Sequence, residues 1–130
     1  MAETIVSRLF SQADRLGAQP AAHYHSGSFW TPVGWRQVGD LVRHVAAGLM
    51  ELGHQKGDAV AILANTRFEW LIADLGCLAA QGITVGVYAT MTSDQARYLI
   101  DHGDVRFVFV EDKAQLEKLR KVQDQLPRVE

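Results

Sequence analysis

Three short runs of consecutive apolar residues constrain the fold of this chain more than any other feature of its sequence. They are AVAILA at 59–64, ITVGV at 83–87 and, after one arginine, FVFV within 106–110, and their first residues are 24 and 23 positions apart. Unbroken apolar runs of this length are typical of strands covered on both faces in a parallel sheet. The spacing leaves room for one crossover helix between successive strands. The sequence therefore predicts a layered α/β/α fold with a mainly parallel sheet and right-handed crossovers.

Helical periodicity fills the segments around these strands. An amphipathic helix is predicted from Thr4 to Leu16 before Gly17, and a longer helix from Trp35 to Leu52 before Gly53. Between these helices the sequence predicts a pair of short strands separated by Gly27, at 21–26 and 28–35. Further helices are expected at 67–82, 93–103 and 113–126. The residues leave the strand order open.

Composition limits the classes of protein to which the chain can belong. With 130 residues, 48% of them apolar, residues 1–130 are expected to form one domain with no internal boundary. The formal charge is -2 and basic residues do not cluster, so nucleic acid is not an expected partner. Cys77 is the only cysteine, and its apolar surroundings predict a buried thiol. No signal peptide or transmembrane segment is recognisable, so we expect a cytoplasmic protein.

The junctions between strands and helices are where a nucleotide-binding α/β domain places its phosphate loop. The first junction, after AVAILA, contains no glycine, although glycine lets a phosphate approach the free N–H groups of a helix start. The three junctions instead carry patterns of helix caps. The predicted pairs are Thr66 with Glu69, Thr92 with Gln95, and Asp112 with Gln115. We therefore predict that each helix start is closed by its own side chains and binds no nucleotide.

Other side chains that could carry chemistry are interpreted as structural. His23 and His25 alternate on one strand, but no third ligand lies nearby in the sequence to complete a metal site. Asp74 lies in an apolar helix and is expected to pair with an arginine or with backbone N–H groups. The remaining candidates are interpreted as surface histidines (His44, His54, His102) or as tryptophans packed in or beside the core (Trp30, Trp35, Trp70). The sequence thus predicts no catalytic residue, no cofactor-binding residue and no metal ligand.

The order of these signals resembles the N-terminal region of the adenylate-forming (AMP-binding) enzymes, and most closely the long-chain fatty acyl-CoA synthetases. The similarity covers about residues 35–112 and rests on the joint order of helix starts, helix ends and strands. The matching residues are Trp35, Arg36, Leu52, Gly53, Gly57, Asp58, Val60, Ala61, Ile62, Asn65, Glu69, Trp70, Gly82, Val85, Tyr88 and Thr90. The chain departs from the family at Gly34, where a Thr or Ser helix cap is usual, and at Gly86 and Ala89, where prolines are usual.

The resemblance implies a fatty acid–CoA ligase that activates its substrate with ATP to an acyl-adenylate and then transfers the acyl group to coenzyme A. The family's phosphate loop, adenine-binding stretch, Mg-linked motif and catalytic lysine all belong downstream. The resemblance therefore implies the leading part of the large N-terminal domain, with ATP, Mg and coenzyme A bound by the parent and none bound by this segment. Its expected partners are the downstream part of the same polypeptide and, through uncovered apolar surface, a second copy. The parent would be cytoplasmic or peripheral at the inner membrane.

Two alternatives follow from the same alternation of strands and helices. A free-standing flavodoxin-like or receiver-like module would bind a partner without catalysis. A receiver needs an acidic pair after its first strand, which ANTRFE lacks, and an aspartate after its third, where Glu111 and Asp112 stand. A Rossmann dehydrogenase is disfavoured because no G-x-G-x-x-G follows any strand.

Overall fold

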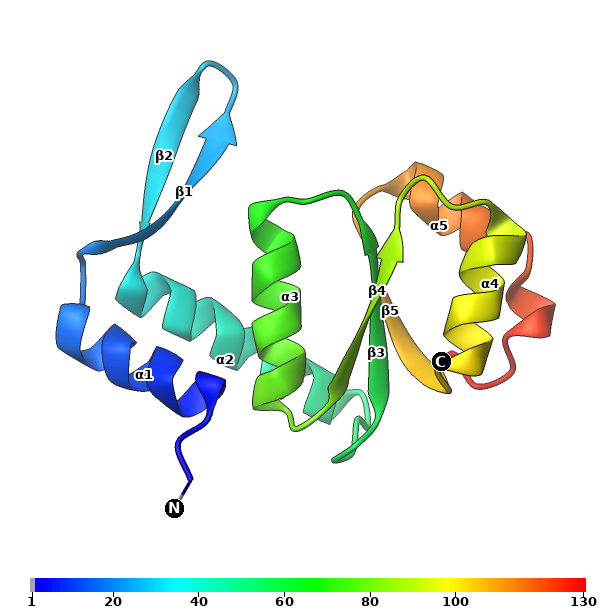
Figure 1. The fold of residues 1–130 in the computed structure, drawn as a ribbon, viewed down its shortest axis with the longest axis horizontal. Coiled ribbons are helices and arrows are strands. Elements are labelled where there is room, and N and C mark those ends of the chain that lie inside the picture. The colour runs from blue at the N-terminus through cyan, green and yellow to red at the C-terminus, as the bar shows by residue number, and fades with distance from the viewer. Residues whose placement is uncertain (1) are drawn as a thin grey trace.

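The computed structural model describes residues 2–130, which form a helix, a hairpin, a second helix and then alternating strands and helices (Figure 1). The elements are α1 (Ile5–Leu16), β1 (Pro20–Ser26), β2 (Phe29–Gly34), α2 (Trp35–Glu51), β3 (Ala59–Ala64), α3 (Phe68–Ala79), β4 (Ile83–Tyr88), α4 (Ser93–His102), β5 (Val105–Val110), α5 (Lys113–Arg120) and the 3₁₀ turn η1 (Gln123–Gln125). Every predicted helix and strand is present. The last predicted helix is shorter than expected, because it ends at Arg120 and η1 follows as a separate turn.

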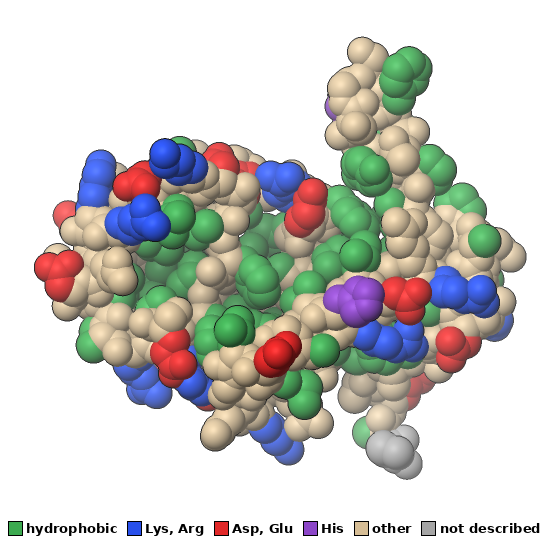
Figure 2. Space-filling view, turned by 180° about the vertical axis from the view of Figure 1, so that it is seen from behind, with side chains coloured by type: hydrophobic (Ala, Val, Ile, Leu, Met, Phe, Trp, Pro, Cys, Tyr) green, Lys and Arg blue, Asp and Glu red, His purple; other side chains and the backbone are tan. Residues whose placement is uncertain are grey.

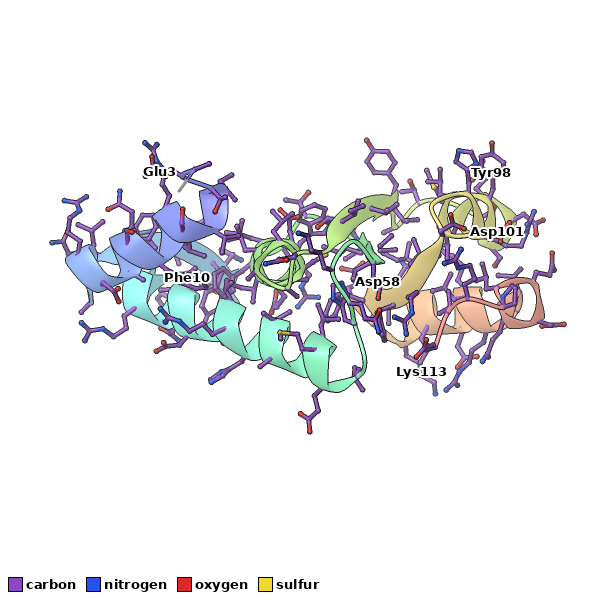
Figure 3. All side chains as sticks on the ribbon, turned by 90° about the horizontal axis from the view of Figure 1, so that it is seen from below. Glu3, Phe10, Asp58, Tyr98, Asp101 and Lys113 are labelled. Carbon is purple, nitrogen blue, oxygen red and sulfur yellow. The ribbon has the colours of Figure 1, made fainter. Side chains whose placement is uncertain are left out.

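The strands β3, β4 and β5 form a parallel sheet in the order β4-β3-β5. Of these three strands, β3 comes first in the chain and lies in the centre of the sheet. Helices α2 and α3 lie on one side of this sheet and α4 and α5 on the other, as Figures 1 and 3 show from two directions. This arrangement confirms the predicted α/β/α layering. No helix within residues 2–130 combines the length and the apolar character needed to cross a membrane.

The core lies against both faces of β3, which is buried at five of its six positions. Leu63 belongs to the cluster under α4 and α5, while Val60 belongs to the cluster under α2 and α3. The outer strand β4 is much less covered, since Ile83 is 56% exposed and Tyr88 is 75% exposed. The expectation that all three strands are covered on both faces is thus correct for β3 and wrong for β4, where three of six residues are exposed, whereas every residue of β5 is buried or half-buried.

Helices α2 and α3 approach each other closely where α3 carries a glycine. A Cβ atom built on Gly76 would lie 2.3 Å from Val45 Cγ1 and 2.5 Å from Val45 Cβ. No side chain other than hydrogen fits at that distance. Gly76 is therefore the residue that sets how closely the two helices pack.

The end of α2 explains why one histidine is buried. The Gly53 N–H donates to the Met50 carbonyl and the His54 N–H to the Leu49 carbonyl, both at 3.0 Å, and Gly53 has a φ of 96°. This is a Schellman motif, as the glycine predicted. The tight turn carries the His54 ring inward, where it is 6% exposed, with its centroid 6.0 Å from that of Phe107. The prediction of a surface position for His54 is therefore wrong.

The β1–β2 hairpin stands away from the α/β body (Figures 1 and 2). Near its turn, Phe29 and Trp30 are 76% and 67% exposed. The prediction that Trp30 packs in or beside the core is wrong, because this two-stranded ribbon carries it away from the helices. The base of the hairpin packs on the helices through Val33, which is 2% exposed in the cluster with Val42 and Ile72, and the Tyr24 ring stacks on Phe68 of α3 with centroids 5.8 Å apart. Trp35 and Trp70 are half-buried.

Candidate functional site at the carboxyl edge of the sheet

The strand order singles out one place where a ligand would be expected. In open α/β sheets, ligands bind beyond the carboxyl ends of the strands, between two neighbours whose crossovers run to opposite sides. Here the helix after β3, α3, packs on one face of the sheet, whereas the helix after its neighbour β5, α5, packs on the other face. The candidate site therefore lies between the loop after β3, residues 65–67, and the loop after β5, residues 111–112.

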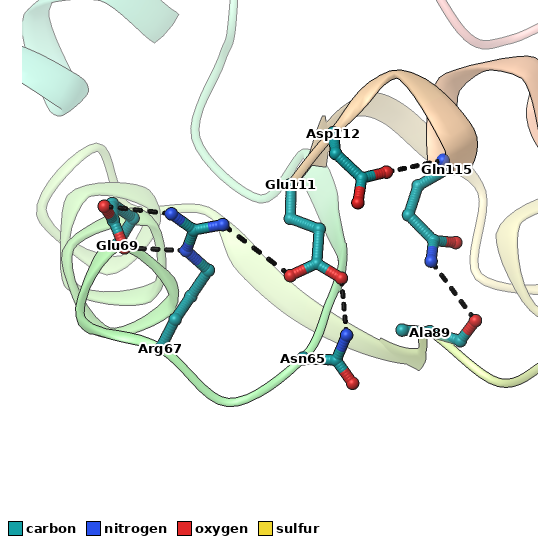
Figure 4. A network of polar contacts seen from close by, with 7 residues as sticks. All are labelled: Asn65, Arg67, Glu69, Ala89, Glu111, Asp112 and Gln115. Carbon is teal, nitrogen blue, oxygen red and sulfur yellow. Dashed lines mark hydrogen bonds and ion pairs between the residues drawn. The ribbon is translucent and has the colours of Figure 1, made fainter. Parts of the chain in front are cut away.

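A network of polar side chains joins these two loops (Figure 4). The Asn65 Nδ2 donates to Glu111 Oε1 at 2.6 Å, and Arg67 Nη1 lies 3.7 Å from Glu111 Oε2. The same guanidinium donates to both carboxylate oxygens of Glu69, at 2.7 and 3.2 Å. Arg67 is thus shared between two carboxylates, one on each side of the candidate site.

Burial and charge in this network differ from residue to residue. The Glu111 side chain is 8% exposed, whereas Arg67 is 42% exposed. The pKa of Arg67 is raised mainly by its hydrogen bonds to Glu69. The same hydrogen bonds hold the pKa of Glu69 below its ordinary value. The network is therefore a largely solvent-exposed ion-pair cluster with one buried carboxylate, and it ties α3 to the end of β5.

The space beside the network does not suit a nucleotide. The hollow has a volume of about 200 Å³ and is bordered by Trp70, Phe109, Arg67, Glu69 and Glu111, among others. Pockets that hold small ligands usually measure roughly 300–1,000 Å³. Phosphate oxygens placed here would face two carboxylates, and the arginine between them is already paired. The residues present therefore do not fit the phosphates of ATP.

The helix starts around the site confirm two of the three predicted caps. At α4, Thr92 Oγ1 accepts from the Gln95 N–H at 3.3 Å and Gln95 Oε1 accepts from the Thr92 N–H at 3.0 Å, which completes a capping box. At α5, Asp112 Oδ1 accepts from the Gln115 N–H at 2.9 Å. These side chains use helix-start donors that a phosphate would need.

The third predicted cap, Thr66 with Glu69, is wrong. Helix α3 begins at Phe68, so its N-cap is Arg67, which makes no capping hydrogen bond with its side chain. A capping box joins the N-cap to the third helical residue, and Thr66 lies one position too early for that spacing. Glu69 consequently turns to Arg67 and becomes part of the network.

The other candidate residues are spread over the molecule. His23, His25, His44 and His102 are exposed. Within residues 2–130, no three His, Cys, Asp or Glu side chains gather in a way that could hold a metal ion. Asp74 is half-buried and belongs to none of the ion pairs found in this part of the chain, so its expected arginine partner is absent there. Cys77 is fully buried, as predicted, and burial raises the pKa of its thiol.

The sequence analysis did not predict a second charged cluster, which lies at the amino ends of strands β3 and β5. Arg106 Nη1 donates to Asp58 Oδ2 at 2.5 Å and to the Gly53 carbonyl at 3.2 Å, and its guanidinium also pairs with Glu130. Asp58 Oδ2 accepts in addition from the Gln55 N–H at 2.8 Å. The only signal was the G-D pair that precedes β3, because Arg106 is 48 residues away in the chain.

This cluster predicts acid sensitivity. The Gln55 N–H, and after it Arg106, holds the pKa of Asp58 below its ordinary value. The stabilisation is therefore complete above the unfolded pKa of about 3.9 and is lost as pH falls through the lower folded pKa. Asp58→Asn should lower the free energy of unfolding at pH 7 by about 1–2 kcal/mol. Urea unfolding between pH 7 and pH 2 should show the two curves converging at acid pH, and curves that stay parallel would contradict it.

This chain is similar in sequence and in fold to known proteins of one family. The sequence model of the AMP-binding enzyme family matches residues 9–130. The long-chain-fatty-acid–CoA ligase ACSBG2 of Rattus norvegicus is 34% identical over 118 residues, which are 90% of this chain and 18% of the relative. The long-chain-fatty-acid–CoA ligase FadD15 of Mycobacterium bovis is 32% identical over 98 residues, or 75% of this chain and 16% of the relative. The chain thus spans less than a fifth of the length of these relatives.

Solved structures agree on the architecture. The N-terminal domain of FACL13 from Mycobacterium tuberculosis has a TM-score of 0.86 at 18% identity, with 98% of this chain and 33% of that chain covered. The anthranilate CoA ligase AuaEII, solved with anthranoyl-AMP, has a TM-score of 0.83 at 20% identity, with 95% of this chain and 23% of that chain covered. At these identities the likeness shows the fold, in which residues 2–130 correspond to only part of an N-terminal domain.

Proposed function

Because the chain belongs to the AMP-binding enzyme family, we propose that it is the N-terminal part of a long-chain fatty acid–CoA ligase. The full-length enzyme would activate a fatty acid with ATP to an acyl-adenylate and then form the thioester with coenzyme A. The choice of substrate class is supported by relatives named long-chain-fatty-acid–CoA ligases at 31–34% identity. We place this enzyme in the cytoplasm or at the periphery of the inner membrane.

Within that enzyme, residues 1–130 would serve as a scaffold without catalytic, cofactor-binding or metal-binding residues. The observation that carries this proposal is the network at the carboxyl edge of the sheet. Asn65 and Arg67 hold the buried Glu111 carboxylate at the point where an α/β sheet would bind its ligand. ATP, Mg and coenzyme A would be bound by the downstream part of the polypeptide, which is the partner of this segment. Residues 1–130 would then be one incomplete domain.

The alternative of a free-standing flavodoxin-like or receiver-like module gains no support from the geometry. Glu111 follows β5, where a receiver would carry its aspartate, but its carboxylate is 8% exposed and is held by Asn65 and Arg67. A carboxylate in that position is not available to a phosphoryl donor. The scaffold proposal accounts for the network and the module does not.

The scaffold proposal predicts that the chain alone is inactive. Purified residues 1–130, supplied with palmitate, Mg-ATP and labelled pyrophosphate, should show no ATP–pyrophosphate exchange above a protein-free control. Isothermal titration with Mg-ATP should show no saturable heat. A full-length long-chain ligase is the positive control under the same conditions. Exchange by the chain alone that disappears in an Arg67→Ala variant would overturn the proposal, because Arg67 would then serve the substrate.

A further inference from the structure

The β1–β2 hairpin lacks formal charge although most of its residues are exposed. Residues 16–35 contain no Lys, Arg, Asp or Glu, whereas these four types make up 22% of the chain. A similar uncharged run at 75–93 belongs to α3 and β4, which pack in the α/β body. Charged side chains ordinarily cover exposed surface. A projecting ribbon without them is therefore suited to surroundings less polar than water.

Large aromatic side chains occupy both faces of the hairpin near its turn. Phe29 and Trp30 are consecutive residues of β2, so their side chains point to opposite faces. Phe29 shares its face with Val33, which packs on the helices, and Trp30 lies on the other face, edge-on to the His25 ring with centroids 5.2 Å apart. A ribbon that docks on a protein covers it with one face. This tip is apolar on both faces and stands clear of the body (Figures 1 and 2).

The tip is too small to hold a protein partner by itself. An aromatic side chain buries about 150–250 Å², whereas a stable interface between proteins buries roughly 800 Å² on each partner. Phe29 and Trp30 together supply about half of that area at most. A lipid bilayer sets no minimum area, because each apolar group that enters it contributes to binding. The size of the tip therefore favours a bilayer over a protein.

The edges of the hairpin limit how deeply it can enter a bilayer. Within residues 2–130, β1 and β2 pair only with each other, so each strand leaves one edge with unpaired N–H and C=O groups. Such groups cannot enter the hydrocarbon core without a large cost in free energy. Tryptophan and tyrosine side chains are enriched at the level of the lipid headgroups. The tip therefore fits the headgroup region and not the hydrocarbon core.

We propose that the turn end of the hairpin, residues 25–30, enters the headgroup region of a lipid bilayer and holds the protein at the membrane surface. This rests on the proposed function, because a long-chain fatty acid partitions into bilayers and its ligase would meet the substrate there. Two aromatic side chains bury no more apolar area than one acyl chain, which alone anchors a protein only marginally. Binding through the tip is therefore weak and reversible.

Vesicle binding by residues 1–130 tests the proposal. Sedimentation with phosphatidylcholine vesicles at millimolar lipid should show binding that Phe29→Thr weakens by about tenfold. Threonine keeps the strand propensity at this position. The matched control is Tyr88→Thr, because Tyr88 is an aromatic residue of β4 with 75% exposure, close to the 76% of Phe29, and this variant should bind like the unchanged chain. Equal binding by the two variants would overturn the proposal.

Trp30 reports its own depth. In Trp35→Phe plus Trp70→Phe protein, Trp30 is the sole tryptophan, and its emission should shift to shorter wavelength on vesicles. A quencher attached near the headgroup should quench this emission more than a quencher at the end of an acyl chain. No shift, or stronger quenching at the bilayer centre, would contradict the proposed depth and overturn the proposal. A shift that appears without vesicles as protein concentration rises would assign the tip to a second copy and overturn it as well.

Lipid charge separates the tip from a basic surface. The seven residues of β1 span roughly 20 Å, beyond the Debye length of about 8 Å at physiological salt. Arg15 and Arg36, which flank the hairpin at its base, therefore add little. Binding should be equal for phosphatidylcholine and for an equal mixture with phosphatidylglycerol, and binding only to the mixture would overturn the proposal. None of these readouts uses ATP, so a failure here is distinct from a failure of the ligase assignment.

Discussion

Replacing Gly76 by alanine should lower the free energy of unfolding by about 3 kcal/mol, the upper part of the range for overpacked cores. The added methyl group would lie 2.3 Å from Val45 Cγ1 and 2.5 Å from Val45 Cβ, between two helices that are both packed against the sheet. Helices held in this way cannot move apart without opening the clusters beneath them. Urea unfolding monitored by circular dichroism would measure the loss.

Gly48, on the facing helix α2, provides a matched control. Gly48 is inside α2, and a Cβ built on it would meet no heavy atom within 4 Å. Gly48→Ala should therefore raise the free energy of unfolding by about 0.5–1 kcal/mol, through helix propensity alone. Adding Val45→Ala to Gly76→Ala should restore only part of the stability, because the Cβ of residue 45 remains. Losses of equal size at Gly76 and Gly48 would show that helix spacing is not the cause.

A second large loss is expected from Ile62→Ala, which should cost about 3–4 kcal/mol. Ile62 is 1% exposed in the central strand, so the lost side chain leaves a cavity that the surrounding strands and helices cannot close. Ile83 is the matched control, because it is the same residue type on the neighbouring strand β4 but is 56% exposed. Ile83→Ala should cost less than about 1 kcal/mol.

The comparison of these two isoleucines tests the strand order itself. Both variants would be unfolded in urea at the same pH, with their m-values compared to confirm that the unfolding transition is unchanged. A loss at Ile83 equal to that at Ile62 would contradict the edge position of β4.

Most of the fold was predictable from local patterns. The apolar runs at 59–64, 83–87 and 106–110 and the helical periodicity between them predicted the α/β layers, and the structure confirms them. The resemblance to the AMP-binding family is likewise confirmed. The strand order was not predictable, because both neighbours of β3 are apolar strands with similar crossovers. Burial of β4 was overestimated for the same reason, since an apolar run does not reveal which strands lie at an edge.

The candidate site was predictable only in part. Thr92 and Asp112 were correctly predicted as caps because their partners lie three residues away in the chain. The contact between Asn65 and Glu111 spans 46 residues and follows from the strand order, so no local pattern could reveal it. Thr66 failed as a cap because helix α3 begins one residue later than the pattern requires. His54 was misplaced because its burial depends on the turn after α2.

The central strand of the sheet leaves the ribosome before either of its partners. At about 5–20 residues per second, β5 emerges a few seconds after β3, because 46 residues separate their first positions, Ala59 and Val105. In that interval β3 can be sheltered by α2, made earlier, and by β4, while its other side stays open to neighbouring nascent chains. Slow translation between α3 and β5 would lengthen this exposure, so the order β4-β3-β5 ties the aggregation risk of this chain to the speed of its synthesis.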